Sequence, residues 1–274
     1  MKSINTIPEI SNSAIIEQIL NQTGQFDISP LDLKKIDELL KVNSYDFDFN
    51  KFKKIGEVGE QLELRGILDI KASSIFLDEN EKLGSRKRFS HAHEIGHYLI
   101  PSHRDYLYQC TESDMNPSTL QALEREANQF ASELLFKGPL FYEALRDIET
   151  VSFHNVGEIA KLFNVSFVAS LRKVVSETNQ PAAMVIVSEK NGSGLIDYTI
   201  GSESMRDNYF RDISNIPSLA EIIKKSKVAS RHDPHRVKLR AMLSNGEKVV
   251  LGCQFYYNGY QHVGLICPEK TADV

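Results

Sequence analysis

Cysteine is scarce in this sequence. Its 274 residues include only Cys110, Cys253 and Cys267, which are widely spaced. They form neither a CxxC metal motif nor a disulfide framework, so the composition favours a reducing cytosol. Long apolar stretches are absent as well, because the longest, at residues 182–187, is far shorter than the ~18 residues of a membrane-spanning helix. The N-terminal stretch lacks the apolar core of a signal peptide. We therefore expect a cytoplasmic protein with no membrane partner.

The sequence also has no excess of basic residues. Its 32 lysines and arginines are outnumbered by 37 aspartates and glutamates, which gives a net charge of −5. This balance provides no overall attraction to nucleic acid or to an anionic membrane. A hydrophobic content of 41% and a charged content of 25% are typical of a globular protein with a buried core. The length suggests about two domains.

Residue periodicity predicts a largely helical first part of the chain. The first fifty residues read as helical, and an amphipathic helix begins at Ser29-Pro30 and continues to Leu40. Residues 61–70 and 73–80 read as two short strands joined by a tight connection. A helix with an N-cap at Ser85 follows and ends at Pro101.

Two further helical segments and a strand-rich region complete the prediction. Residues 118–137 carry apolar side chains at intervals of three and four. Residues 153–176 read as helix, turn, helix, with Asn164 in the turn. Beyond Pro181 the sequence reads as strands with Asn-Gly turns, interrupted by one helix at 218–227.

Residues 93–97 read HEIGH and match the pattern H-E-x-x-H on the helix predicted to begin at Ser85. Two histidines four residues apart lie on one helical face, about 5–6 Å apart at Cβ, so His93 and His97 can both reach one cation. Glu94 is rotated to the side, where it can contact a water on that cation without binding the metal itself. The motif therefore predicts a metal site with Glu94 as the catalytic residue.

A catalytic zinc takes three protein ligands and leaves one position open, and two residues compete for the third place. His103 follows His97 by six residues, as in H-E-x-x-H-x-x-G-x-x-H. Ile100 occupies the glycine position of that pattern, and a β-branched residue is poorly suited to positive φ. We therefore interpret His103 as an ordinary surface histidine.

The other candidate ligand lies on the helix predicted at residues 118–137. Glu124 and Asn128 are four residues apart and project together, so Glu124 can bind the metal while Asn128 orients a ligating histidine from behind. Glu126 points elsewhere and reads as a surface ion pair or as an outer contact of the site. We favour Glu124 over His103.

The resulting set of His93, His97 and Glu124 is that of thermolysin-like zinc peptidases. In that chemistry the metal makes a bound water acidic and polarises the scissile carbonyl, while Glu94 takes the proton from the water and passes it to the leaving amine. A further group has to stabilise the oxyanion. The sequence does not choose among the nearby candidates Tyr98, His103, Tyr106 and Tyr108.

Two motifs of this sequence occur in a fixed order, RKRFSHAHEIGHYLI and then LEREANQFASELLF. In their content, order and separation they resemble the ImmA/IrrE family of bacterial metallo-endopeptidases. The helix DLKKIDELLKV, the strands with GILDI and the segment GEIAKLFNVSFVASLRKVV fit the same layout. The resemblance covers residues 25–176. The proline that usually follows the second motif is replaced by Phe136-Lys137-Gly138-Pro139.

The resemblance implies a zinc-dependent endopeptidase that cuts a specific protein partner, typically a helix-turn-helix repressor, and so releases transcription in a stress or mobile-element response. In the family pattern the two HEIGH histidines and Glu124 bind Zn²⁺, and Glu94 is catalytic. We expect an α+β fold with three parts: a helical HEXXH zinc-peptidase core with a small β-sheet at 1–150, a helix-turn-helix-like segment at 151–178, and a C-terminal α+β domain, resembling a GAF sensor, at 179–274.

Two other functions are compatible with these motifs. One is a non-proteolytic transcription regulator that binds DNA or a repressor and uses the metal structurally. The other is the peptidase of a toxin–antitoxin or prophage switch. Direct DNA reading is disfavoured, because the second helix of 153–176 begins SFVAS and offers basic residues only at Arg172 and Lys173.

Overall fold

The chain forms two compact units. The computed structural model describes residues 11–53, 65–103, 117–190, 193–209, 219–242, 246 and 248–268. Unit 1 comprises Met1–Tyr142 and Leu162–Val165, and unit 2 comprises Glu143–Lys161 and Ser166–Val274. No helix in these described ranges has both the length and the apolar character that a membrane span requires.

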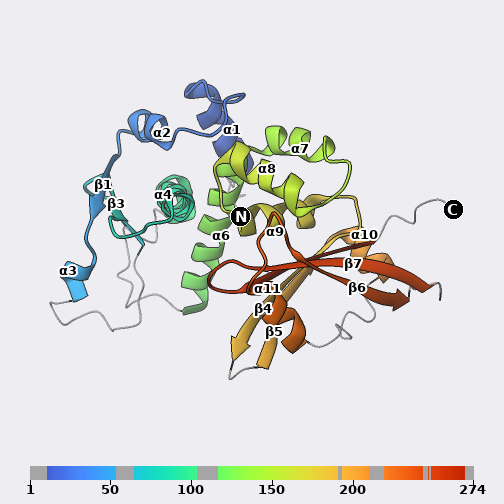
Figure 1. Ribbon diagram of the computed structural model, residues 1–274. Helices are drawn as coiled ribbons and strands as arrows, with labels where there is room; N and C mark the ends of the chain where they lie inside the picture. Colours follow the sequence, from blue (N-terminus) through green and yellow to red (C-terminus); the bar gives the residue numbers. More distant parts are fainter. Residues whose placement is uncertain are drawn as a thin grey trace, which may run out of the picture. The chain divides into compact units, whose positions relative to one another are not determined.

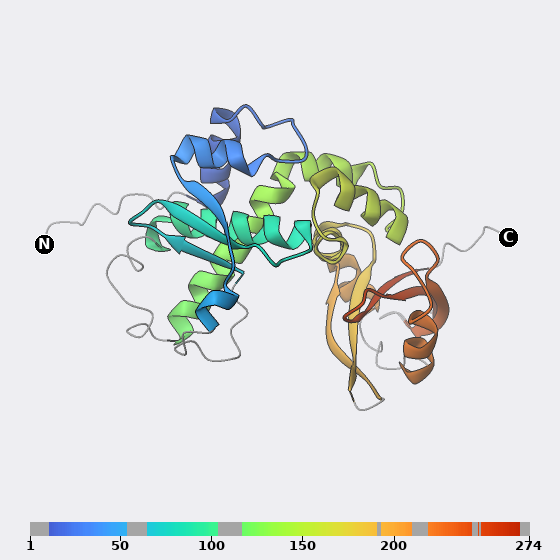
Figure 2. The same cartoon turned by 60° about the vertical axis from the view of Figure 1, so that its left-hand side comes forward.

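Unit 1 combines helices with a three-stranded sheet (Figure 1). Its described elements, in chain order, are α1 (Asn12–Gln22), α2 (Leu33–Leu40), β1 (Asn43–Phe47), α3 (Asn50–Lys53), β2 (Gly66–Asp69), β3 (Ser74–Asp78), α4 (Gly84–Leu99) and α6 (Pro117–Phe136). The strand order is β1-β3-β2, with β1 parallel and β2 antiparallel to β3. Helix α4 contacts β2 and β3 as well as α6, and it lies between the sheet and α6 (Figure 2).

Helices α4 and α6 are packed closely along their apolar faces. Ile95 on α4 and Ala127, Phe130 and Leu134 on α6 are fully buried, and burial of one such large side chain stabilises a fold by about 1.5–3 kcal/mol. A Cβ at Gly96 would lie 3.1 Å from Cδ1 of Phe130. The missing side chain at Gly96 therefore lets α6 approach the helix that carries HEIGH.

The predicted helices of unit 1 are present, but their starts differ from the sequence-based predictions. Helix α2 begins after Asp32, whose carboxylate accepts a hydrogen bond from the backbone N–H of Lys34 at 3.0 Å. The predicted start at Ser29-Pro30 is therefore wrong, and a side chain with two acceptor oxygens caps the helix instead. Ser85 lies inside α4, which has no side-chain N-cap.

Residues 43–47 form strand β1 where the sequence predicted a helix. The strand pairs with β3 in parallel, from Asn43 opposite Ser74 to Phe47 opposite Asp78. Its pairing with a distant segment stabilises an extended conformation that local periodicity does not reveal. The strand predicted at 73–80 is present as β3. Of the strand predicted at 61–70, residues 66–69 form β2, and residues 61–64 lie outside the described ranges.

Two helices, α7 (Gly138–Arg146) and α8 (Phe153–Phe163), have residues in both units. The remaining elements are α9 (Phe167–Glu177), β4 (Ala183–Lys190), β5 (Ser193–Gly201), α10 (Glu203–Tyr209), α11 (Leu219–Ser226), β6 (His235–Met242), β7 (Lys248–Tyr257) and β8 (His262–Pro268). They give unit 2 an antiparallel sheet in the order β5-β4-β8-β7-β6. The predicted α+β class is confirmed.

Strand β4 lies inside unit 2 with both faces covered. Its first five residues, 183–187, are at most 1% exposed, which explains why this run is apolar without alternation. Ala183, Val185 and Val187 share a buried cluster with Ile222 and Ile223 of α11. Helix α9 also contacts β4 and β5.

The helix-turn-helix segment is present as α8 and α9. Asn164 adopts the left-handed conformation with φ of 50°, as predicted, and the Ser166 hydroxyl accepts a hydrogen bond from the N–H of Ala169 at 3.1 Å. On α9, Arg172 donates to the Tyr198 hydroxyl at 2.6 Å, and Lys173 pairs with Glu177 at 3.1 Å. Helix α9 is therefore a packing element on the sheet of unit 2, where Arg172 contacts β5 and Lys173 pairs within its own helix.

Candidate metal centre

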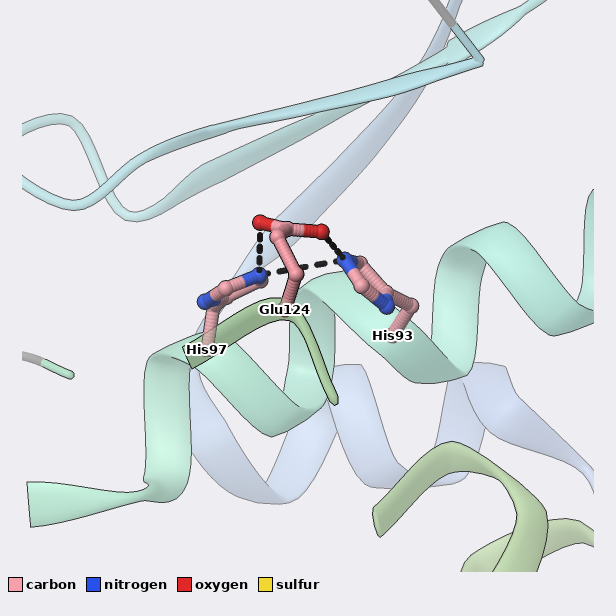
Figure 3. A group of neighbouring side chains, drawn as sticks. All are labelled: His93, His97 and Glu124. Carbon is pink, nitrogen blue, oxygen red and sulfur yellow. Dashed lines mark hydrogen bonds and ion pairs between the residues drawn. The ribbon is translucent and has the colours of Figure 1, made fainter. Parts of the chain in front are cut away.

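Three side chains from two helices of unit 1 converge on one point (Figure 3). His93 and His97 project from α4, and Glu124 projects from α6. The two histidine Nε2 atoms are 3.0 Å apart. Nε2 of His93 lies 3.2 Å from Oε2 of Glu124, and Nε2 of His97 lies 3.2 Å from Oε1 of the same carboxylate. The structure thus brings together the three residues that the sequence predicted as ligands.

The spacing of these atoms fits a small cation. Tetrahedral zinc with bonds of about 2.0–2.2 Å holds its ligand atoms about 3.3–3.6 Å apart, close to the three observed separations. Two imidazole nitrogens and a carboxylate oxygen also match the donors that such an ion takes. Among the described residues, these three form the one group of His, Cys, Asp or Glu with metal-binding spacing. A tetrahedral ion would retain an open fourth position.

The site is open on the side of Glu124. The Glu124 side chain is 56% exposed, whereas those of His93 and His97 are 14% and 10% exposed. The two histidines are held by the buried packing of α4 against α6, and the carboxylate reaches them from the solvent side. Water or a peptide can therefore approach the open coordination position.

The charges of the three side chains stabilise one another. Hydrogen bonds from His93 and His97 hold the pKa of Glu124 far below its usual range. Burial lowers the pKa of His93, but the hydrogen bond to Glu124 and the charges of Glu94 and Glu124 outweigh it, so that pKa is raised. The carboxylate of Glu124 is therefore ionised at neutral pH.

Glu94 lies beside this group in a different environment. Its side chain is buried against β2, where a Cβ built on Gly66 would lie 2.6 Å from Oε1 of Glu94. Burial raises the pKa of Glu94, and the charges of His93 and His97 partly oppose the shift. The absence of a side chain at Gly66 provides the space for this carboxyl group, a feature that sequence reasoning missed.

Residues 50–174 match the family model described as the IrrE N-terminal-like domain, Peptidase_M78. This stretch of the chain is similar to that family. The matched range contains HEIGH, Glu124 and the helices that hold them. The suspected resemblance to ImmA/IrrE proteins is confirmed at the level of this domain, which is of a metallopeptidase type.

Similarity in fold to a solved structure extends beyond residues 50–174. A solved structure described as a Mycobacterium tuberculosis transcriptional regulator is similar with a TM-score of 0.57 and 12% sequence identity. The similarity covers 96% of this chain and 78% of that chain. At this identity the likeness concerns the fold alone. No curated protein matches the chain by sequence.

His103 lies next to His97 and not on the surface. The interpretation as an ordinary surface histidine is wrong, because this residue is 0% exposed. Its Nδ1 lies 3.0 Å from Nδ1 of His97, on the side of that ring opposite to Glu124. Ile100 has φ −69° and ψ 117°, the extended conformation that a following proline favours. The chain therefore turns at Ile100-Pro101 and returns to His97 without a left-handed residue.

Glu126 completes the arrangement around His103. Its Oε2 lies 3.2 Å from Nε2 of His103, and its Oε1 accepts a hydrogen bond from the Asn12 amide at 3.3 Å. Burial and the charge of His97 lower the pKa of His103, so it is neutral at pH 7. Glu126 is thus an outer contact of the site, one of the two roles that its helical position allowed.

Asn128 lies next to His93. Its side chain is among the groups that raise the pKa of His93. Within the described part of the chain, the buried Nδ1 of His93 has no hydrogen-bond partner. Tyr106 and Tyr108, two candidates for stabilising an oxyanion, lie outside the described residues.

A buried histidine–carboxylate pair also involves α4, at a histidine two residues before His93. Nε2 of His91 lies 3.0 Å from Oδ1 of Asp37, and the Ser44 hydroxyl donates to Oδ2 of the same carboxylate at 2.7 Å. His91 and Asp37 are 7% and 5% exposed. This pair ties α2 to α4 and does not contact the three converging side chains.

Proposed function

We propose that this chain is a cytoplasmic zinc-dependent endopeptidase that cleaves a specific protein partner. The observation that carries the proposal is the convergence of His93, His97 and Glu124 at tetrahedral spacing, beside the buried carboxyl of Glu94. The IrrE N-terminal-like family model over residues 50–174 supports the same reaction class.

Each residue has a separate task in this proposal. His93, His97 and Glu124 hold the ion, and a bound zinc supplies Lewis acidity that lowers the pKa of water and polarises a carbonyl. Glu94 takes a proton from the attacking water and delivers it to the leaving amine. Asn128 orients His93. The open side next to Glu124 admits the peptide.

The arrangement favours catalysis over a purely structural metal. Structural zinc sites are usually closed by four protein ligands, whereas catalytic sites keep one position open. Three ligand candidates come together in the described part of the chain. This count favours the peptidase over a non-proteolytic regulator, and it fits equally the peptidase of a toxin–antitoxin or prophage switch.

The proposed substrate is a helix-turn-helix repressor, whose cleavage relieves repression. The family resemblance of the two motifs supports this partner, and so does the likeness in fold to a protein described as a transcriptional regulator. Direct DNA binding by α9 is not proposed, because its buried face packs on β4 and β5. We assign residues 179–274, which contain the sheet of order β5-β4-β8-β7-β6, to regulation as a GAF-like sensor.

The test uses as substrate the protein encoded by the neighbouring gene, which we expect to be a helix-turn-helix repressor. We expect cleavage by the zinc-loaded wild type, no cleavage with a chelator, and no cleavage by Glu94→Gln, which still binds about one zinc per chain. His93→Ala and Glu124→Ala should lose the metal. Glu133→Gln, on α6 but outside the site, is the matched control. Full activity of Glu94→Gln would show that the mechanism is wrong.

A further inference from the structure

A series of polar contacts connects Nδ1 of His97 to the first turn of α1. Nδ1 of His97 is 3.0 Å from Nδ1 of His103, and Nε2 of His103 is 3.2 Å from Oε2 of Glu126. The Asn12 amide donates to the other Glu126 oxygen at 3.3 Å. This series of contacts therefore joins the end of α4, the middle of α6 and the first turn of α1.

The contacts define where each proton lies. When His97 binds a cation through Nε2, it carries its proton on Nδ1. That N–H can donate only if Nδ1 of His103 is an unprotonated acceptor. His103 then carries its own proton on Nε2 and donates it to the Glu126 carboxylate. With one neutral tautomer of each ring, both the His97–His103 and the His103–Glu126 hydrogen bonds form. The other tautomer of either ring would leave at least one of these hydrogen bonds without a donor or an acceptor.

Helical geometry explains why one helix contributes both Glu124 and Glu126. The two carboxylates are two residues apart, and such residues point in different directions on a helix. Glu124 faces Nε2 of His97, and Glu126 faces His103 on the opposite side of the same imidazole. Helix α6 therefore holds the His97 ring at both ends, directly at one nitrogen and through His103 at the other.

We propose that His103 and Glu126 are positioning residues, which hold the His97 imidazole in the tautomer and orientation that present Nε2 to the metal. This inference rests on the proposed function. Hydrogen bonds from a ligating histidine to an outer group fix the ring and raise its basicity, and their loss typically weakens metal binding about 10–100-fold. His103 supplies that hydrogen bond, and Glu126 orients His103.

The test measures zinc affinity of the full chain by competition with a chromophoric chelator. His103→Phe retains the ring volume and removes both hydrogen bonds, and we expect its zinc dissociation constant to rise about 10–100-fold. Glu126→Leu removes only the carboxylate, and a rise of about 10-fold is expected. His103→Gln retains an acceptor and a donor, so it should recover most of the affinity.

His91→Phe is the matched control, because it removes another buried histidine–carboxylate pair of α4 that does not contact the ligands. Its zinc dissociation constant should stay within about threefold of wild type. If His103 had only a structural role, His103→Phe and His91→Phe would change the zinc dissociation constant by the same factor. Proton NMR of the zinc-loaded chain adds a second measurement: a slowly exchanging Nδ1–H of His97 in wild type and His103→Gln, absent in His103→Phe.

The possible outcomes separate this inference from the proposed function. Zinc dissociation constants within threefold of wild type in His103→Phe and Glu126→Leu would overturn the inference and leave the peptidase proposal standing. If His103→Phe does not fold by circular dichroism, Glu126→Leu decides, because its side chain is 41% exposed and its replacement creates no cavity. A wild-type chain that binds no zinc would overturn both.

Discussion

Two carboxyl groups beside the same pair of histidines experience opposite environments. Hydrogen bonds from His93 and His97 lower the pKa of Glu124, whereas burial raises the pKa of Glu94. The first favours a permanently charged ligand and the second favours a group that can accept and release a proton. Such a division between neighbouring carboxyl groups is typical of sites that perform acid–base chemistry.

The space at Gly66 leads to a prediction about Glu94. A Cβ in Gly66→Ala would lie 2.6 Å from Oε1 of Glu94, so the carboxyl group has to move away from its position. We expect cleavage of the partner protein to fall about tenfold while zinc stoichiometry stays at one per chain. Initial rates and metal analysis of the purified variant measure the two quantities.

A second glycine supplies the control for this experiment. A Cβ built on Gly157 of α8 meets no atom within 4 Å, so Gly157→Ala should retain the wild-type rate. Equal rates for Gly66→Ala and wild type would mean that the carboxyl group of Glu94 does not need the position that it occupies here.

The three converging side chains could be predicted at the residue scale, because helical spacing places the candidates of each helix on one face, while the packing of α4 against α6 brings the two faces together. His93 and His97 share a face by periodicity, and Glu124 shares a face with Asn128. The roles of His103 and Gly66 could not be predicted, since each depends on where the chain goes after a turn. Ile100 correctly excluded a left-handed turn, but only the packing shows that the extended turn brings His103 back to His97.

At the scale of elements, the end of α6 contains a buried lysine. Lys137 follows the last residue of the helix with φ of 48°, is 1% exposed, and donates to the backbone carbonyl of Gln25 at 2.9 Å. The Gln25 side chain in turn bonds the backbone N–H and carbonyl of Asp32. One ammonium group thus connects α6 to the segment between α1 and α2.

This lysine makes stability depend on pH. Burial lowers the pKa of Lys137 to about 8 from the ordinary 10.5. The unfolded chain therefore binds more protons between pH 8 and 10.5, so this group destabilises the fold below pH 8 and the cost is relieved as the pH rises. We expect the free energy of unfolding of wild type, relative to Lys137→Met, to increase by about 2 kcal/mol between pH 7.5 and 9.5.

Urea unfolding at a series of pH values measures this difference. Lys161→Met, at an exposed lysine of α8, provides the baseline for removing one positive charge. Parallel curves for wild type and Lys137→Met across that range would mean that the ammonium group is not desolvated in the folded chain.

Element types were more predictable than element ends. The helices around HEIGH and residues 118–137 have strong periodicity and are present, as are the strands of unit 2. The start of α2 depended on Asp32 competing with Ser29, two good capping residues three positions apart. Strand β1 depended on its pairing with β3. Helices α7 and α10 were not predicted, although α7 is no shorter than α2.

At the scale of the whole molecule, metal binding should stabilise the unit that holds the site. A ligand present at about 100 times its dissociation constant stabilises the folded state by about 2.7 kcal/mol. We expect zinc to slow hydrogen exchange in peptides from α4 and α6 and to leave those from β4 and β8 unchanged. Mass spectrometry of the exchanged, digested chain gives both sets at once.

His93→Ala is the reference for this measurement, since it removes one ligand and keeps the rest of the chain. Its exchange rates should not respond to zinc. Equal protection of β4 and β8 by zinc in the wild type would contradict the localisation of the effect to unit 1.

The hydrogen bond from Asn12 to Glu126 has a practical consequence for anyone who trims this protein to the range of the family model. A fragment cloned from residue 50, where that range begins, would lack Asn12. Such a truncation would keep His93, His97 and Glu124 but would remove one hydrogen bond that holds Glu126 next to His103, so weak metal binding by the fragment would not describe the full chain.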